Sequence, residues 1–425
     1  MKNDADCCLC RLGILERRQT PRISTRKENT QHNVFEFEYD PKALADPELS
    51  SITLDPRIGP FEGRQFPGEH QSRFGVFADS SPDRWGQLLM KRRLERDIRD
   101  GLLPSNSKLF ESDYLLGVHD LFRVGALRYK LNDEGNFLDD RDGVAAPPFV
   151  ELRALEQASL ALENDRDNTA TEGREWLRML IAPGGSLGGA RPKASVVDEF
   201  GQLWIAKFPS TRDDYDVGGW EFVINALAVN CGLRVATGMA RRYASDHHCF
   251  LVKRFDRTAR GGRHHFASAM TMTNRIDGDD ASTGASYLEL AEVIMEHGSE
   301  PNTDLRELWS RIVFNILVSN TDDHLRNHGF VLDPGRGWRL SAAYDMNPVA
   351  HAEGLKLNIT DSDNALDLEL AREVAEYFRV SRSDAENIFQ HFKSVISQWP
   401  ALAGALRLST REQDSMTTAF RNSGQ

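Results

Sequence analysis

The chain has 425 residues and a formal net charge of -12, from 52 Lys and Arg against 64 Asp and Glu. This length accommodates about two or three domains. The acidic excess disfavours direct binding to nucleic acid or to an anionic membrane, because neutralising phosphates requires a surplus of Lys and Arg. No apolar run reaches the length of about 18 residues that would span a membrane, and the five Cys predict no disulfide framework. We therefore expect a cytoplasmic protein without a membrane segment.

The first part of the chain predicts short elements separated by polar connections. Residues 1–30 are polar and irregular, and we leave them unassigned. The alternation of apolar and polar residues at 34–39 predicts a strand, and a second strand is expected at 124–129. Between them, Ser81 is a plausible N-cap for a helix that has a proline in its first turn. Residues 130–148 are polar and contain Pro and Gly, which is typical of a linker.

The rest of the chain changes from mixed elements to helices. We expect helices at 152–163 and 172–180, strands at 194–197 and 203–209, a helix at 220–228 and a strand at 249–255. From residue 287 onward the pattern predicts almost only helices, interrupted by a hairpin of 330–332 with 338–340. Strands first and helices later predict an α+β part followed by a helical part.

The strongest chemical signal is the segment 320–327, with the sequence Asn-Thr-Asp-Asp-His-Leu-Arg-Asn. Asp322 precedes Asn327 by five residues, which is the spacing of a kinase catalytic loop, where the carboxylate orients a hydroxyl and the amide oxygen holds Mg²⁺. Asp345 follows a short apolar segment further along the chain and is a candidate for a second Mg²⁺ ligand. The alternative for the segment is an ordinary helix-to-strand turn, since Asn, Asp and Thr favour turns.

A glycine-rich stretch and a lysine on a later strand are candidates for phosphate binding. Residues 184–193 contain four Gly around Ser186 and end at Lys193, and Gly lets backbone N–H groups approach phosphate oxygens. Lys207 lies in a strand that is predicted to be buried, where a lysine is costly unless it pairs with an anion. Glu221 on the next helix is the expected ion-pair partner, as in kinases. A surface hairpin and a snorkelling edge-strand lysine are the plainer alternatives.

The remaining polar clusters predict no metal site. His247-His248 and His264-His265 are adjacent pairs, whose side chains point apart in a strand and form no natural chelate. We expect these four residues on surface loops. The Cys near the start of the chain lack a fourth ligand and the spacing of a zinc site.

Five motifs follow one another along the chain: Ser-Leu-Gly-Gly-Ala-Arg-Pro-Lys at 186–193, Ile-Ala-Lys-Phe-Pro at 205–209, Lys-Arg-Phe-Asp-Arg at 253–257, Thr-Asp-Asp-His-Leu-Arg-Asn at 321–327 and Tyr-Asp at 344–345. In this order they resemble the HipA family, the serine/threonine kinase toxins of type II toxin–antitoxin systems. Upstream, Pro-Asp-Arg-Trp-Gly at 82–86 and Arg-Val-Gly-Ala-Leu-Arg at 123–128 resemble that family's N-terminal subdomain. The resemblance covers residues 33–400 and departs from the family at Arg191-Pro192, where Pro removes one N–H donor.

The resemblance implies an α+β, two-lobed, protein-kinase-like fold. A HipA-like N-terminal subdomain would occupy residues 31–147. The mixed α/β N-terminal lobe, with the phosphate loop, would occupy 148–257. An all-helical C-terminal lobe, with the catalytic loop, would occupy 258–425.

The resemblance also implies individual roles around ATP and Mg²⁺. Asp322 is similar to the catalytic base, Asn327 and Asp345 to the Mg²⁺ ligands, and Ser186 to the family's autophosphorylated serine, whose modification shuts the kinase off. Lys207 would contact phosphate, and main chain near Lys253 and Phe255 would meet adenine. The implied ATP-binding set is Ser186, Leu187, Gly188, Gly189, Ala190, Lys193, Lys207, Lys253, Phe255, His324 and Asn327.

The implied partners are a cellular protein substrate and a helix-turn-helix antitoxin similar to HipB, which would be the chain's only link to DNA. Two alternatives from other classes stay open. One is a small-molecule kinase of the aminoglycoside or choline type, whose catalytic loops also place Asn five residues after Asp. The other is an interaction subunit that binds nucleotide without turnover. The serine at position 186, inside the phosphate loop, favours the protein kinase.

Overall fold

The structure is a computed structural model. It describes residues 35–47, 52–68, 71–130, 136–138, 147–165, 172–181 and 189–423. The candidate residues Ser186, Leu187 and Gly188 lie outside the described residues, as do residues 1–30. Within the described ranges, no helix combines the length and the apolar character needed to cross a membrane.

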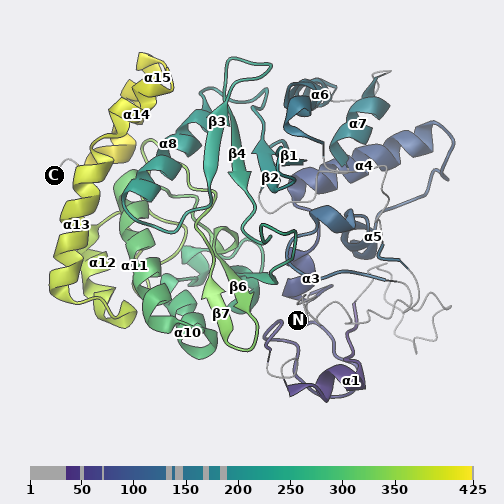
Figure 1. Ribbon diagram of the computed structural model, residues 1–425, viewed down its shortest axis with the longest axis horizontal. Coiled ribbons are helices and arrows are strands. Elements are labelled where there is room, and N and C mark those ends of the chain that lie inside the picture. Colours follow the sequence, from purple (N-terminus) through teal and green to yellow (C-terminus); the bar gives the residue numbers. More distant parts are fainter. Residues whose placement is uncertain are drawn as a thin grey trace.

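A four-stranded antiparallel sheet forms the centre of the first lobe, with the strand order β1-β2-β4-β3 (Figure 1). Its strands are β1 (Lys193–Val197), β2 (Leu203–Lys207), β3 (Gly238–Arg241) and β4 (Cys249–Lys253). Lys193 pairs with Lys207, and Ile205 pairs with Val252. Because directly paired residues share a face of a sheet, the two lysines and two apolar side chains line the same face. The sequence predicted three of these strands and missed β3.

Helices cover the other face of this sheet. Helices α6 (Leu152–Asn164) and α7 (Gly173–Ile181) lie where the periodicity predicted them. Their apolar residues pack in one cluster with Ala206 of β2 and Leu251 of β4. Trp85 joins the same cluster from the N-terminal part of the chain, so that part packs directly on the first lobe.

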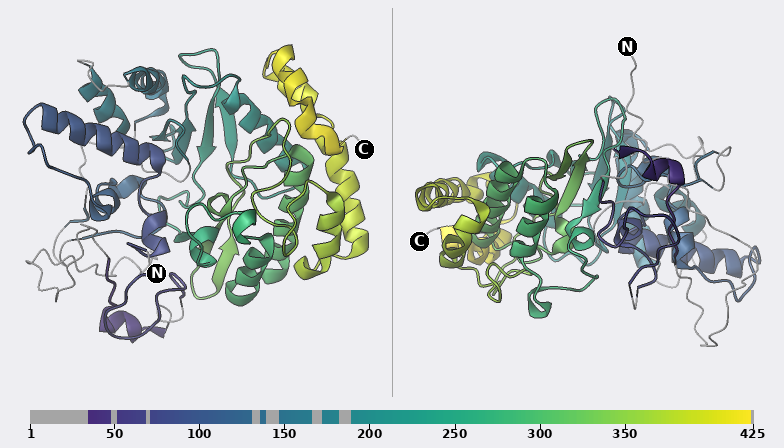
Figure 2. Two further views of the ribbon diagram at one scale, coloured as in Figure 1. Left: turned by 180° about the vertical axis from the view of Figure 1, so that it is seen from behind. Right: turned by 90° about the horizontal axis from the view of Figure 1, so that it is seen from below.

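The second lobe is built around α11 (Pro301–Val318), whose last eleven residues are all buried. Trp309 of α11 stacks on Phe389, with ring centroids 5.5 Å apart. Helix α8 (Val217–Asn230) belongs to the first lobe, where it contacts β3 and β4, and it also contacts α14 (Trp399–Ala405) of the second lobe. The helices around α11 are α10 (Tyr287–His297), α12 (Leu368–Val374), α13 (Arg382–Ile396), α14 and α15 (Thr410–Met416). The last four form the yellow end of the molecule, opposite the N-terminal elements (Figure 2).

The second lobe also contains a three-stranded sheet, so it is not all-helical as expected. The strands are β5 (Phe266–Ser268), β6 (Gly329–Asp333) and β7 (Gly337–Leu340), in the order β5-β6-β7. β6 and β7 are the predicted hairpin. β5 is only three residues long, which is too short to give a periodic signal. It pairs Ser268 with Gly329, directly after the candidate catalytic loop.

The N-terminal part departs most from expectation. Its helices are α1 (Pro41–Leu44), α3 (Gly75–Asp79), α4 (Arg84–Arg99) and α5 (Glu111–Leu116). α4 begins after Asp83, whose carboxylate accepts a hydrogen bond from the Gly86 N–H at 2.9 Å, whereas the Ser81 hydroxyl donates backwards to the Phe77 carbonyl. Of the strand expected at 34–39, the described residues 35–39 form one bridge, between Phe37 and Gln65. Residues 124–129 form no strand.

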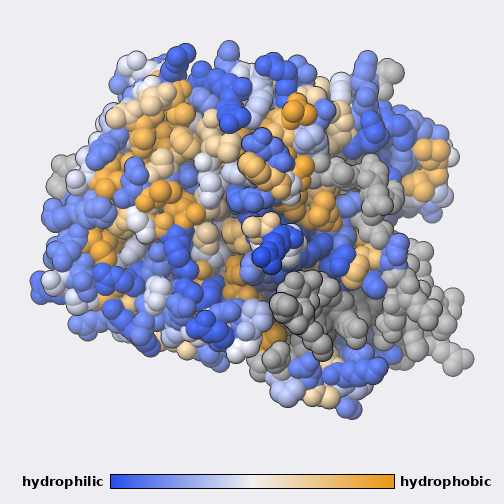
Figure 3. All heavy atoms as spheres, in the orientation of Figure 1, coloured by the Kyte–Doolittle hydropathy of each residue, from blue (hydrophilic) through white to orange (hydrophobic). Residues whose placement is uncertain are grey.

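The face of the molecule drawn in Figure 3 is hydrophilic over much of its area, in keeping with the acidic composition. Hydrophobic residues gather over the region of α8, α13 and α14, where Val229 of α8 is exposed. The polar candidate residues lie elsewhere, between the two lobes.

Candidate active site

Lys207 ends β2 and reaches two carboxylates. Its Nζ lies 2.5 Å from Glu221 Oε1 and 2.5 Å from Asp345 Oδ1, and its side chain is 8% exposed. Glu221 reaches it from α8, whose start is fixed by the Asp216 carboxylate accepting from the Gly219 N–H. The ion pair expected between Lys207 and Glu221 is therefore present. The contact with Asp345 joins both to the second lobe.

Charge and burial have opposite effects on the pKa values of the triad formed by Lys207, Glu221 and Asp345. Burial alone would lower the pKa of Lys207, but the two carboxylates raise it. Burial raises the pKa of Glu221 despite the lysine. Burial would also raise the pKa of Asp345, but Lys207 outweighs it and lowers that pKa to about 2. Asp345 is thus held as a carboxylate at neutral pH.

The backbone at Asp345 is strained and anchored. Its φ is 58°, in the left-handed region, which costs a non-glycine residue about 1–2 kcal/mol. On one side of it the Ala343 carbonyl accepts from the Ala236 N–H at 2.9 Å, and the Tyr344 hydroxyl donates to the Arg326 carbonyl at 2.8 Å. The second contact ties the Asp345 segment to the loop of residues 320–327.

That loop begins where α11 ends, at Ser319 with a left-handed φ of 50°. Asp322 is exposed, and its pKa is raised, first by partial loss of solvent and then by the negative charges of Asp345 and Asp323. Asn327 is buried, and its side-chain Nδ2 donates to the Asp322 carbonyl at 3.0 Å. This bond orients the amide, so that its oxygen is the atom suited to a cation.

Asp323 holds this loop through partners from other elements, which the sequence interpretation did not assign to it. Its Oδ2 accepts from the Tyr287 hydroxyl at 2.5 Å and from Asn315 Nδ2 at 2.8 Å, and lies 2.7 Å from His328 Nε2. Burial would raise the pKa of Asp323, but His328 and the hydrogen bonds lower it. A signal was available, because Asn315 interrupts an otherwise apolar stretch of α11. We expected His324 in the site; its Nδ1 is buried without a hydrogen-bond partner among the described residues.

Lys193 has a buried partner of its own. Its Nζ lies 2.8 Å from Asp83 Oδ2 and 3.1 Å from the Gly189 carbonyl. The Lys193 carbonyl accepts from Trp85 Nε1 at 3.0 Å. Lys193 is also close enough to help lower the pKa of Asp345. It therefore joins the N-terminal part of the chain to the candidate site, while Gly189 and the following Ala190 are exposed.

A pocket lies beside Lys207 and Asp345. It is lined by Val124, Ile205, Val252 and Tyr344, by residues 253–256, and by Lys207 and Asp345. The Lys253 N–H already donates to the Thr237 carbonyl at 2.8 Å, so Phe255 is the better candidate for main-chain contacts with a base. The apolar walls and the charged end with Lys207 and Asp345 suit a ligand that has a flat apolar part and an anionic part.

The family model of the HipA-like C-terminal domain matches residues 185–399, which is 215 of the 425 residues. The chain belongs to the HipA-like family. The matched range contains Lys207, Glu221, Asp322, Asn327 and Asp345.

Relatives and a solved structure agree with this family. "Putative kinase Y4mE" and "Putative kinase Y4dM" of Sinorhizobium fredii are both 25% identical to the chain, over 60% and 51% of its length. The matches span 64% and 56% of those proteins, less than two thirds of each. A chain of the toxin–antitoxin complex of HipA, HipB and operator DNA from Shewanella oneidensis MR-1 has a TM-score of 0.60, at 15% identity and 92% coverage of both chains. The predicted α+β, two-lobed HipA-like fold is confirmed.

Proposed function

We propose that this HipA-like protein is an ATP-dependent kinase that phosphorylates a serine or threonine hydroxyl of a protein. The observation that carries the proposal is the contact of Lys207 with both Glu221 and Asp345 at 2.5 Å. A lysine placed by a helix glutamate, next to an ionised aspartate from the other lobe, is the arrangement that phosphoryl transfer from ATP requires.

Each residue has a chemical task in this reaction. Asp322 orients the acceptor hydroxyl and takes its proton as the oxygen bonds to the γ-phosphorus. The bond from that phosphorus to the bridging oxygen breaks, and ADP leaves. Lys207 binds phosphate oxygens of ATP. The raised pKa of Asp322 makes it a better proton acceptor than an ordinary aspartate.

The donor set also fits Mg²⁺. The Asp345 carboxylate, which stays ionised with its pKa of about 2, and the amide oxygen of Asn327 are hard oxygen ligands of the kind that Mg²⁺ prefers. When bound, the ion would neutralise charge on the phosphates. Asp345 is already held in place by Lys207, so the protein keeps one ligand ordered in advance.

The finer features of the proposal come from the family. Ser186 would be the autophosphorylated residue, and phosphate there would add about two negative charges to the phosphate loop. A HipB-like antitoxin would bind the kinase and tether it to DNA, which suits a chain with a net charge of -12. The complex from Shewanella oneidensis, which contains HipA, HipB and operator DNA, supports this partner.

Mass spectrometry after incubation with Mg²⁺ and ATP tests the proposal. Phosphatase-treated protein should gain one phosphate on Ser186, Asp322→Asn should gain none, and Asp361→Asn should match the wild type. Asp361 is an exposed acid in the same lobe, so the control removes the same charge elsewhere. Phosphate on added aminoglycosides or choline, with none on protein, would identify a small-molecule kinase. ATP binding without any transfer would contradict the proposal.

A further inference from the structure

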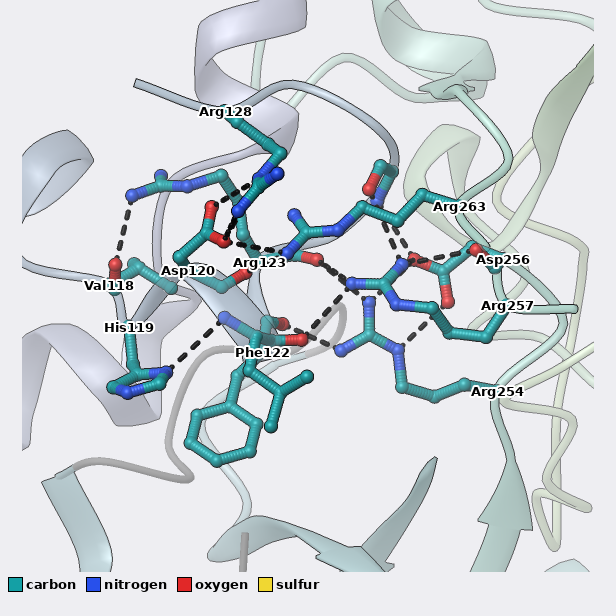
Figure 4. Close-up of polar contacts among 12 residues, drawn as sticks. Val118, His119, Asp120, Phe122, Arg123, Arg128, Arg254, Asp256, Arg257 and Arg263 are labelled. Atoms are coloured by element: carbon teal, nitrogen blue, oxygen red, sulfur yellow. Dashed lines mark hydrogen bonds and ion pairs between the residues drawn. The ribbon is translucent and has the colours of Figure 1, made fainter. Parts of the chain in front are cut away.

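Arginines gather around two aspartates where the segment after β4 meets residues 118–128 (Figure 4). At the centre lies Asp256, which is 4% exposed. Its Oδ1 accepts from Arg254 Nε at 2.8 Å, and its Oδ2 accepts from Arg257 Nη1 at 2.7 Å and from the Gly125 N–H at 2.8 Å. One carboxylate thus orients two guanidinium groups and holds a backbone amide from the N-terminal part of the chain.

The two guanidinium groups in turn bind main-chain carbonyls. Arg254 donates from Nη1 to the Phe122 carbonyl at 2.6 Å and from Nη2 to the Arg123 carbonyl at 3.0 Å. Arg257 Nη2 donates to the same Arg123 carbonyl at 2.6 Å. Hydrogen bonds from charged donors are shorter and stronger than neutral ones. Residues 122–125 are therefore fixed by side chains and not by pairing with another strand.

This fixation acts on the pocket beside Lys207. Val124, which lines the pocket, lies between the two anchored groups, the Arg123 carbonyl and the Gly125 N–H. Gly125 has a φ of 72°, and a Cβ there would lie 3.1 Å from the Phe266 N, so the backbone at this point leaves little room to adjust. Arg254 and Asp256 line the same pocket. The position of its Val124 wall thus depends on Asp256.

We propose that Asp256 is a positioning residue for the nucleotide. It orients Arg254 and Arg257, holds Gly125, and so fixes the Val124 wall against which the base of the bound nucleotide lies. The inference rests on the ATP binding proposed above. It assigns to the N-terminal part of the chain a direct share in the pocket for the base, distinct from the phosphate contacts of Lys207.

The same cluster supplies a matched control. Asp120 accepts from Arg128 Nη2 at 2.6 Å and from Arg263 Nη2 at 2.9 Å, but it is not among the residues that line the pocket. Asp120→Asn removes a carboxylate from the arginine cluster without loosening Gly125. An effect that came only from the balance of charge in the cluster would appear in both variants.

Titration calorimetry of the full chain with ATP and with inorganic tripolyphosphate, each with Mg²⁺, separates the alternatives. Asp256→Asn should weaken ATP binding about tenfold, the factor that one charge-assisted hydrogen bond represents. Its affinity for tripolyphosphate should not change, because that ligand has no base. Asp120→Asn should bind both ligands as the wild type does. A general structural defect would weaken both ligands together.

Several outcomes would overturn the inference. They are equal ATP affinity in Asp256→Asn and wild type, parallel losses for both ligands, and an equal loss in Asp120→Asn. If Asp256→Asn does not fold, Arg254→Lys takes its place, because it keeps the charge but loses the planar fork. The same loss for ATP alone supports the inference, and unchanged ATP binding overturns it. Wild-type protein that binds no ATP would instead contradict the proposed function.

Discussion

The buried pair of Lys193 and Asp83 leads to the sharpest prediction about stability. The side chains of the two residues are 2% and 1% exposed, and they meet at 2.8 Å. Burial raises the pKa of Asp83 even though Lys193 opposes the rise. Lys193→Met would leave the Asp83 carboxylate buried, and among the described residues the Gly86 N–H would be its remaining donor. We expect this variant to be strongly destabilised.

The size of the effect follows from two roles of Asp83, as the ion-pair partner of Lys193 and as the N-cap of α4. Removing one member of a buried ion pair typically costs about 3–5 kcal/mol, because the other charge is left without compensation. Asp83 can escape part of this cost by taking up a proton, so we expect about 3 kcal/mol for Lys193→Met. The double variant Asp83→Asn/Lys193→Met has no buried charge to compensate, and Asn is as good an N-cap as Asp. It should lose only about 1 kcal/mol.

Urea unfolding of the wild type, both single variants and the double variant gives the coupling energy directly. A Lys193→Met variant within about 0.5 kcal/mol of the wild type would refute the reasoning. ATP affinity measured on the same proteins tests the separate expectation that Lys193 binds phosphate. If Lys193 binds phosphate, ATP affinity should fall by the same factor in Lys193→Met and in the double variant. A purely structural lysine would leave the double variant with nearly normal affinity.

Three further predictions concern chemistry, pH and packing. Asp322→Asn should slow single-turnover phosphoryl transfer by about 10²–10⁴-fold while ATP affinity, measured by calorimetry, is kept; equal rates would exclude it as the base. The pKa of Asp345 falls from 3.8 to about 2 on folding, so its stabilisation is complete above about pH 4 and is lost as pH falls to 2. Over that pH range, urea unfolding of the wild type should show a decrease of about 2 kcal/mol in the free energy of unfolding, and Asp345→Asn should not show this decrease. Gly218→Ala would place a Cβ 2.1 Å from the His248 carbonyl oxygen, and it should lower the free energy of unfolding by at least about 2 kcal/mol. Gly404 on α14 faces open space, so Gly404→Ala should raise the free energy of unfolding by about 0.5–1 kcal/mol. A Tm that shifts in the same direction in Gly218→Ala and Gly404→Ala would contradict the packing argument.

The sequence predicted best those features that depend on local pattern. β2 and α8 follow from apolar runs with clear ends, and Lys207 and Glu221 were assigned from their places on these two elements. The spacing of Asp322 and Asn327 identified the loop because both side chains belong to one short segment. In each case the information lies within a few residues, where periodicity and spacing are informative.

The features that the sequence missed depend on partners far along the chain. Residues 124–129 look like a strand, but Arg254 and Arg257 take up backbone groups next to them. His248 was expected on a surface loop, yet it is buried with its Nδ1 2.5 Å from Asp216 Oδ2. His265 is also buried, against the same expectation. A local sequence pattern cannot indicate that a carboxylate or a guanidinium from a distant element contacts the segment.

The short segment between α3 and α4 shows what such distant contacts accomplish. Asp79, at the end of α3, accepts from the Ser268 N–H at 2.7 Å and from the Thr271 hydroxyl at 2.8 Å, both in the second lobe. Four residues later, Asp83 holds Lys193 in the first lobe. A buried carboxylate on each side of this step therefore connects one lobe to the other. The N-terminal part of the chain is therefore hydrogen-bonded to both lobes, through Asp79 to Ser268 and Thr271 and through Asp83 to Lys193.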